Sequence, residues 1–208
     1  MENMDAKRTA FIAMLSALGI VLSAISLNIA PILSTVGQGG AALDLSHIAT
    51  FIAAIFGGPI VGAIVGLFGG LYSGYYFGFV FGQGLFAVIG VPIGKAMTGF
   101  TAGLLYKKLK IGNGSQHSFY AIPATLLSYV PECIYTVLYF LYIMTFVNGQ
   151  GMAYLIPLVI PKAWVEIIVM SVLMGALAGN TGFREFVNRF LYVQKPQKST
   201  GVAGKIQP

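Results

Sequence analysis

The chain has 208 residues, of which 57% are hydrophobic and only 9% are charged. A soluble domain of this length needs far less apolar surface, so the composition indicates one integral membrane domain without room for a soluble catalytic module. The net charge of +6 comes from cations at the ends of apolar segments. Because no basic patch is interleaved with base-reading polar residues, we expect no nucleic-acid partner. The single cysteine, Cys133, excludes an internal disulfide and a multi-cysteine metal site.

Apolar runs long enough to cross a bilayer, taken in chain order, predict an all-α integral membrane protein built as a six-transmembrane-helix bundle. A short amphipathic helix at about 182–192 is expected at the membrane interface. Residues 1–193 then form a single membrane domain, and the polar stretch 194–208 forms a flexible cytoplasmic tail. We expect the six spans at about 9–27, 43–56, 60–76, 86–106, 119–147 and 155–177.

A ladder of glycines begins between the second and third expected spans, runs through the third and continues beyond it. In a membrane, small residues four apart let two helix backbones approach closely. Because four residues turn an α-helix through about 400°, such a row drifts by roughly 40° per step and leaves a single face. We therefore expect the first four or five glycines to form a slanted packing groove, and Gly78 and Gly82 to belong to a loop. The ladder consists of Gly58, Gly62, Gly66, Gly70, Gly74, Gly78 and Gly82.

The positively charged residues determine the expected orientation. The loops 28–42, 77–85 and 148–154, which a six-span model places on one side, contain no lysine or arginine. By the positive-inside rule, both termini are cytoplasmic and the chain is a multi-pass protein of the plasma membrane. The cations that fall together on the other side are Lys7, Arg8, Lys107, Lys108, Lys110, Arg184, Arg189, Lys195, Lys198 and Lys205.

A few ionisable residues remain in or near the predicted spans after the cytoplasmic cations are set aside. Charges in this setting are costly, and they usually face a cavity or one another. On the six-span model their depths lie toward the outer half, where a substrate pocket open to the outside would lie. The five residues are Asp44, Lys95, Glu132, Lys162 and Glu166.

Each of these residues also has a simpler structural interpretation. Lys162 and Glu166 are four apart and could pair along one helix face. Asp44 could cap the second span, and Lys95 could snorkel toward the interface. Glu132 is surrounded in the sequence by four tyrosines, which suit a flat, nitrogen-rich ligand but also suit helix packing or an interfacial belt. The tyrosines are Tyr129, Tyr135, Tyr139 and Tyr142.

Several catalytic motifs were considered. The segment 90–96 resembles a phosphate loop, but it is one residue short and no Ser or Thr follows Lys95. Ser73 lies in a weak match to an intramembrane serine-protease elbow. His47 is the candidate base for it, although the sequence does not clearly place it to activate Ser73. No histidine pair has metal-ligand spacing. We therefore expect no enzyme activity, no metal and no cofactor.

Several segments resemble the S components of energy-coupling factor (ECF) transporters, the membrane subunits that capture vitamins. The resemblance covers spans one to four well and spans five and six loosely. The segments are Leu43-Asp44-Leu45-Ser46, Gly57-Gly58-Pro59 with the glycines that follow, Ala13-Met-Leu-Ser-Ala17, Thr98-Gly-Phe-Thr-Ala-Gly-Leu-Leu-Tyr106 and Pro161-Lys162.

The resemblance implies a mechanism. Such a subunit binds its substrate from outside, under a loop that would here be 28–42, and then docks on a membrane coupling subunit driven by two cytoplasmic ATPases. Ala13 and Ala17 would carry the docking contact. The tryptophan-rich pocket of thiamine-binding members is missing, because Trp164 is alone. The Met-His start of nickel and cobalt members is absent as well, so a metal cargo is not expected.

The leading hypothesis is therefore a substrate-binding subunit for a vitamin or related nitrogenous heterocycle. The rival hypotheses are an intramembrane enzyme that uses Ser73 and His47, and a self-contained channel or secondary carrier. No internal repeat of the kind common in carriers is evident. The predicted substrate-binding residues are Glu132, Lys162 and Glu166, with Asp44 and Gln83 at the mouth, together with Lys95 and Tyr135.

Overall fold

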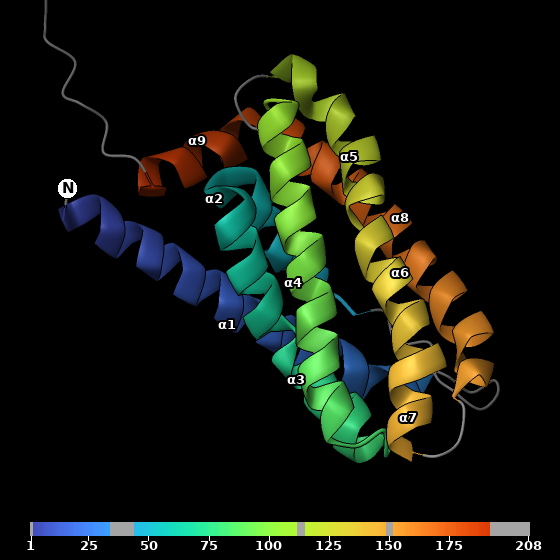
Figure 1. Cartoon of the computed structure of the whole chain (residues 1–208). Coiled ribbons are helices and arrows are strands. Elements are labelled where there is room, and N and C mark those ends of the chain that lie inside the picture. The colour runs from blue at the N-terminus through green and yellow to red at the C-terminus, as the bar shows by residue number, and fades with distance from the viewer. Residues whose placement is uncertain (1, 34–43, 112–114, 149–151, 192–208) are drawn as a thin grey trace, which may run out of the picture.

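The computed structural model describes residues 2–33, 44–111, 115–148 and 152–191, and within these ranges it contains helices and no strand (Figure 1). The expected tail, 194–208, and residues 34–42 of the expected gate loop lie outside the described residues. Residues 28–33 of that expected loop are helical instead, because α1 continues to Leu33. The described part is therefore an all-helical bundle. Its elements are α1 (Glu2–Leu33), α2 (Ser46–Gly69), α3 (Leu71–Tyr75), the π-helix η1 (Tyr76–Val80), α4 (Leu85–Lys108), η2 (Ser115–Tyr120), α5 (Ala121–Ser128), α6 (Val130–Leu138), the π-helix η3 (Tyr139–Ile143), α7 (Met144–Asn148), η4 (Ala153–Leu155), α8 (Ile156–Gly179) and α9 (Thr181–Leu191).

Within the described residues, five helical segments are long and apolar enough to cross a membrane. Four of them correspond to the first, fourth, fifth and sixth expected spans. The remaining one is 35 residues long and contains both the second and the third. The segments are Ala6–Ile29, Ser46–Val80, Leu85–Lys108, Ser118–Phe146 and Ala153–Gly179.

The 35-residue segment reverses its direction at Gly58. Gly58 has a φ of 79°, a backbone conformation that glycine adopts without a steric cost, and Pro59 follows it. A methyl group added to Gly69 would lie 3.9 Å from Cβ of Ser46, whereas a straight helix would hold these residues about 34 Å apart. The helix α2 is therefore two antiparallel arms, 46–57 and 59–69, joined by a tight turn.

The glycine ladder packs along α4. A methyl group on Gly62 would lie 2.5 Å from the carbonyl oxygen of Gly99, and one on Gly74 would lie 2.8 Å from that of Val88. Gly66 and Gly70 meet the backbone of Lys95 and Pro92 in the same way. Because these contacts are to main-chain atoms, any larger residue would push the two helices apart.

The expected extent of this groove was wrong at both ends. Gly58 forms the turn, and a methyl group there would touch nothing within 4 Å. Gly78 is not in a loop: it lies in η1, where a methyl group would be 2.9 Å from the carbonyl oxygen of Gly84 on the way into α4. A π-helix holds more residues per turn than an α-helix, so it offsets the drift of a four-residue spacing. Gly82 lies in the loop before α4 as expected, with a φ of 72°.

The second half of the bundle pairs the broken helix α5–α7 with α8. Pro131 stands in the first turn of α6, and η3 interrupts the segment further on. Against α4, this segment is held close by Gly90, where a methyl group would lie 2.7 Å from the ring of Tyr139. The face of α6 that carries Glu132 is thereby turned toward α4.

The helix α9 packs across one end of the bundle, beside the start of α1 (Figure 1). Its apolar side is anchored by Phe190 on Phe11, with ring centroids 6.4 Å apart, and by Phe183 on Phe56, at 5.8 Å. Val187 is buried in the same contact. The expected amphipathic helix thus exists, one residue displaced at each end from the expected 182–192.

Candidate functional site

A cavity of about 140 Å³ lies between α4, α6, α8 and the start of α2. The sequence alone could not show that these residues meet, because they come from segments far apart in the chain. The cavity is lined by all seven residues predicted to bind substrate, namely Asp44, Gln83, Lys95, Glu132, Tyr135, Lys162 and Glu166.

Lys95 and Asp44 form a buried ion pair at one wall of the cavity. Lys95 is only 3% exposed, so the interpretation of a snorkelling lysine was wrong. Its ammonium group also donates to Ser46 Oγ and to Ser73 Oγ, the latter at 3.0 Å. A buried lysine needs this many acceptors because an isolated charge is strongly disfavoured away from water.

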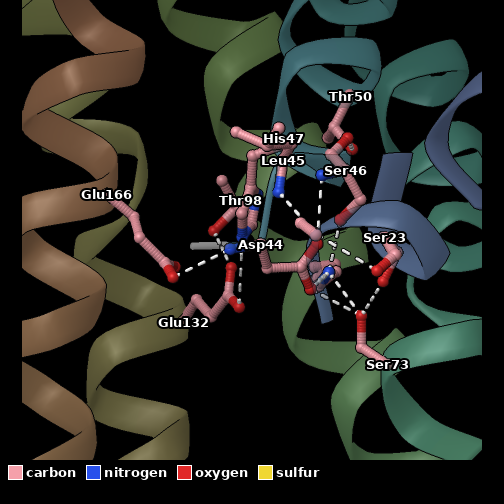
Figure 2. A network of polar contacts seen from close by, with 12 residues as sticks. Ser23, Asp44, Leu45, Ser46, His47, Thr50, Ser73, Thr98, Glu132 and Glu166 are labelled. Carbon is pink, nitrogen blue, oxygen red and sulfur yellow. Dashed lines mark hydrogen bonds and ion pairs between the residues drawn. The ribbon is translucent and has the colours of Figure 1, made fainter. Parts of the chain in front are cut away.

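Asp44 is held from several sides. Its Oδ1 accepts the backbone N–H of Ser46, the first residue of α2, at 3.0 Å. The N-cap of α2 is Leu45 and not Asp44, so the expected capping position was wrong by one residue. Its Oδ2 accepts the hydroxyl of Ser73 at 2.5 Å, and Ser73 in turn lies 2.7 Å from Ser23 Oγ. Figure 2 shows Asp44 between Glu166 on one side and the two serines on the other. The network therefore ties α1, α2, α3 and α4 to the cavity wall.

The opposite wall comes from α8. Lys162 Nζ lies 3.3 Å from Glu166 Oε1, so the pair expected from the four-residue spacing exists. Both residues also line the cavity. Pairing and cavity lining, which the sequence left as alternatives, therefore occur together.

Glu132 projects from α6 and makes a different set of contacts. Thr98, one turn beyond Lys95 on α4, donates its hydroxyl to Glu132 Oε2. Nε2 of His47 lies 4.0 Å from Glu132 Oε1. Glu132 is 9% exposed, so this carboxyl group is nearly enclosed by the protein.

Aromatic rings complete the cavity. Tyr129, Tyr135 and Tyr139 line it, whereas Tyr142 is 67% exposed and points elsewhere. Tyr129 meets Trp164 edge to face, with centroids 5.4 Å apart. Three of the four tyrosines predicted around Glu132 are thus placed to contact a flat ligand.

His47 and Thr98 belong to the site but were not among the predicted site residues. Both follow a predicted residue at helical spacing, since His47 is three residues after Asp44 and Thr98 is three residues after Lys95. Residues three apart share a helix face, so this spacing was an available signal for Thr98 on α4, whereas Asp44 lies before the start of α2 and gives no such signal for His47.

The arrangement of Ser73 does not match the serine-protease interpretation. Its hydrogen-bond partners are Asp44, Lys95 and Ser23, and its side chain is fully buried. His47 lines the cavity from the other side of Asp44 and lies near Glu132 instead. Among the described residues, no group of three or more His, Cys, Asp or Glu is placed to hold a metal ion.

A bundle of membrane-length helices around a small cavity lined by charged residues is the architecture of a ligand-binding membrane protein. The family model described as "ECF transporter, substrate-specific component" matches residues 7–178, and the chain belongs to this family. The resemblance found in the sequence is thereby confirmed, and the chain is a substrate-binding subunit of a membrane transporter and not an enzyme. No match was found among curated proteins, and none among solved structures.

Proposed function

We propose that this subunit captures a vitamin or related nitrogenous heterocycle from outside the cell and delivers it inward by docking on a coupling subunit with two ATPases. The observation that carries the proposal is the cavity itself. It combines two lysine–carboxylate pairs, a further carboxyl group and three tyrosine side chains in about 140 Å³. A ligand with hydrogen-bond donors, acceptors and a flat ring would use each of these features.

We further propose six membrane crossings with both termini in the cytoplasm. The first arm of α2 would belong to the second crossing, and the second arm would form the third crossing together with α3 and η1, as far as Val80. The cations of α9 and the lysines that end α4 lie at one end of the bundle (Figure 1), and the positive-inside rule assigns such an end to the cytoplasm. The amphipathic helix α9 would then lie at the cytoplasmic interface, and the cavity would open toward the outside.

Docking is assigned to the exposed side of α1. Ala13 and Ala17 are exposed one turn apart, together with Met14, which is 55% exposed. Small residues at this spacing allow a partner helix to approach closely. A coupling subunit is also needed on energetic grounds, because the chain has no ATPase motif of its own.

The test is to purify the protein in mild detergent, extract it with solvent and identify bound small molecules by mass spectrometry. One stoichiometric compound of vitamin size is the expected result. An empty protein that no member of a vitamin panel stabilises against heat would contradict the proposal. Uptake by the isolated protein in vesicles, without ATPases, would contradict the assigned energy source.

A further inference from the structure

The acidic and basic groups around the cavity are unequal in number. Three carboxyl groups line it, on Asp44, Glu132 and Glu166, but only the two lysines Lys95 and Lys162 do. Lys95 pairs with Asp44, and Lys162 pairs with Glu166. Glu132 is therefore the carboxyl group that no lysine matches.

The described surroundings of Glu132 contain no lysine or arginine that pairs with it. Its contacts there are the Thr98 hydroxyl and His47 at 4.0 Å, and a histidine is a cation only when it is protonated. Outside the described residues, the segments 34–43, 112–114 and 149–151 contain no lysine, arginine or histidine, and the lysines of 192–208 belong to the tail expected in the cytoplasm. A nearly enclosed carboxyl group without a cation is either protonated or costly to ionise, and a cationic ligand would stabilise its ionised form.

Two further polar atoms of the cavity also have no partner. Nδ1 of His47 and the hydroxyl of Tyr139 are buried without a hydrogen bond, and both residues line the cavity. Buried polar groups are nearly always hydrogen-bonded in folded proteins. A ligand that contacts Glu132 can reach these atoms as well, because they surround the same small volume.

Glu132 and Tyr135 lie side by side on the cavity wall. A methyl group on Gly94 would lie 3.3 Å from Cγ of Glu132 and 3.4 Å from the ring of Tyr135. Glycine at this position therefore lets both side chains of α6 pack directly on α4, which brings the carboxyl group and the tyrosine ring together. Tyrosine faces attract cations within about 6 Å of the ring centre, so the ring and the carboxylate favour the same kind of ligand.

From the unmatched carboxyl group and the polar atoms around it, we propose that the substrate is a small cation whose positive charge resides on a planar nitrogen group bound to Glu132. This inference rests on the proposed function and narrows it from nitrogenous heterocycles in general to cationic ones. An amidinium, an azolium or a protonated aminopyridine has the required chemistry. The same charge count disfavours carboxylate-bearing substrates without a cationic group.

The test uses three probes of one shape and different charge: benzamidine, benzamide and benzoate. Their affinities for the purified full chain are measured at neutral pH by ligand-observed NMR and by thermal shift. We expect benzamidine to bind at least about tenfold more tightly than benzamide, with benzoate weakest, since a charged hydrogen bond contributes on that order. Glu132→Gln should bring the first two affinities within about twofold of each other. The control Glu185→Gln, which changes an exposed carboxylate on α9, should keep the wild-type ratio.

Equal or reversed affinities in the wild type, or an unchanged ratio in Glu132→Gln, would overturn the inference. If Glu132→Gln does not fold, the wild-type series alone decides. If the wild type binds none of the probes, the compound extracted from it decides, because a cation supports the inference and a neutral or anionic compound overturns it. A neutral or anionic compound would leave the proposed function standing, whereas the absence of any ligand would remove both.

Discussion

The backbone N–H of Asp44 donates a 2.9 Å hydrogen bond to Oε1 of Glu166, across 122 positions of the chain. The same carboxylate is paired with Lys162, so α8 holds the main chain directly before α2. Asp44 is the second residue after the expected gate loop, 28–42. A ligand that competes for Glu166 would therefore act on the attachment point of that loop.

Substitutions on α8 should weaken ligand binding. We expect Lys162→Ala and Glu166→Gln each to lower the affinity for the co-purified ligand by about 10–150-fold, because each removes one charged hydrogen bond. Isothermal titration of the purified variants measures this. Glu185→Gln is the control for a carboxylate outside the cavity. Unchanged affinity in both variants would show that the site assignment is wrong.

Removal of the buried Lys95 charge should lower the stability of the fold. In Lys95→Met, Asp44 keeps its buried position without its counter-ion, and breaking a buried pair in this way costs about 3–5 kcal/mol. We expect a lower unfolding midpoint in detergent. The double variant Lys95→Met/Asp44→Asn should recover part of the loss, since neither charge then remains. A double variant less stable than the single one would argue against the pair.

The contact between α2 and α4 should tolerate no added methyl group. Gly62→Ala places Cβ 2.5 Å from the carbonyl oxygen of Gly99, and overpacking of this kind costs about 1–3 kcal/mol. Thermal unfolding measures the effect. Gly182→Ala serves as the control, because its new methyl group would lie 3.4 Å from the nearest atom, Oδ1 of Asn180. Equal unfolding midpoints for the two variants would contradict the close packing.

Bulky residues on the exposed side of α1 should block assembly with the coupling module. We expect Ala13→Trp and Ala17→Trp to abolish co-purification with the coupling subunit and ATPases while ligand affinity stays unchanged. Ile168→Trp is the matched control, because Ile168 is 51% exposed on another helix. Intact complexes with both alanine variants would remove the docking role from this surface.

Much of the candidate site could be predicted because charged side chains within membrane helices are costly and therefore rare. The rarity of ionisable residues alone singled out Asp44, Lys95, Glu132, Lys162 and Glu166. Which residues pair with which could not be predicted in the same way. Lys95 meets Asp44 only because the chain reverses at Gly58 and brings α4 alongside both arms of α2.

The fold was predictable where the helix period is regular, and it was not where the backbone departs from that period. The span boundaries follow from apolar length, and the turn at Gly58 follows from its glycine and proline neighbours. The position of Gly78 depends on the π-helix η1. A π-helix forms its hydrogen bonds five residues apart instead of four, and no simple sequence pattern predicts this change. The same holds for the second π-helix, η3, which passes through the tyrosine cluster.

The glycine contacts between α2 and α4 give the cavity two walls of unequal stiffness. Lys95 and Asp44 are carried by helices whose main chains touch, and these helices cannot separate without losing the whole row of contacts. Glu132 lies on α6 and Glu166 on α8, and these two helices contact α2 and α4 chiefly through side chains. We therefore expect the widening that admits or releases a ligand to occur by movement of α6 and α8, with α4 held in place against α2.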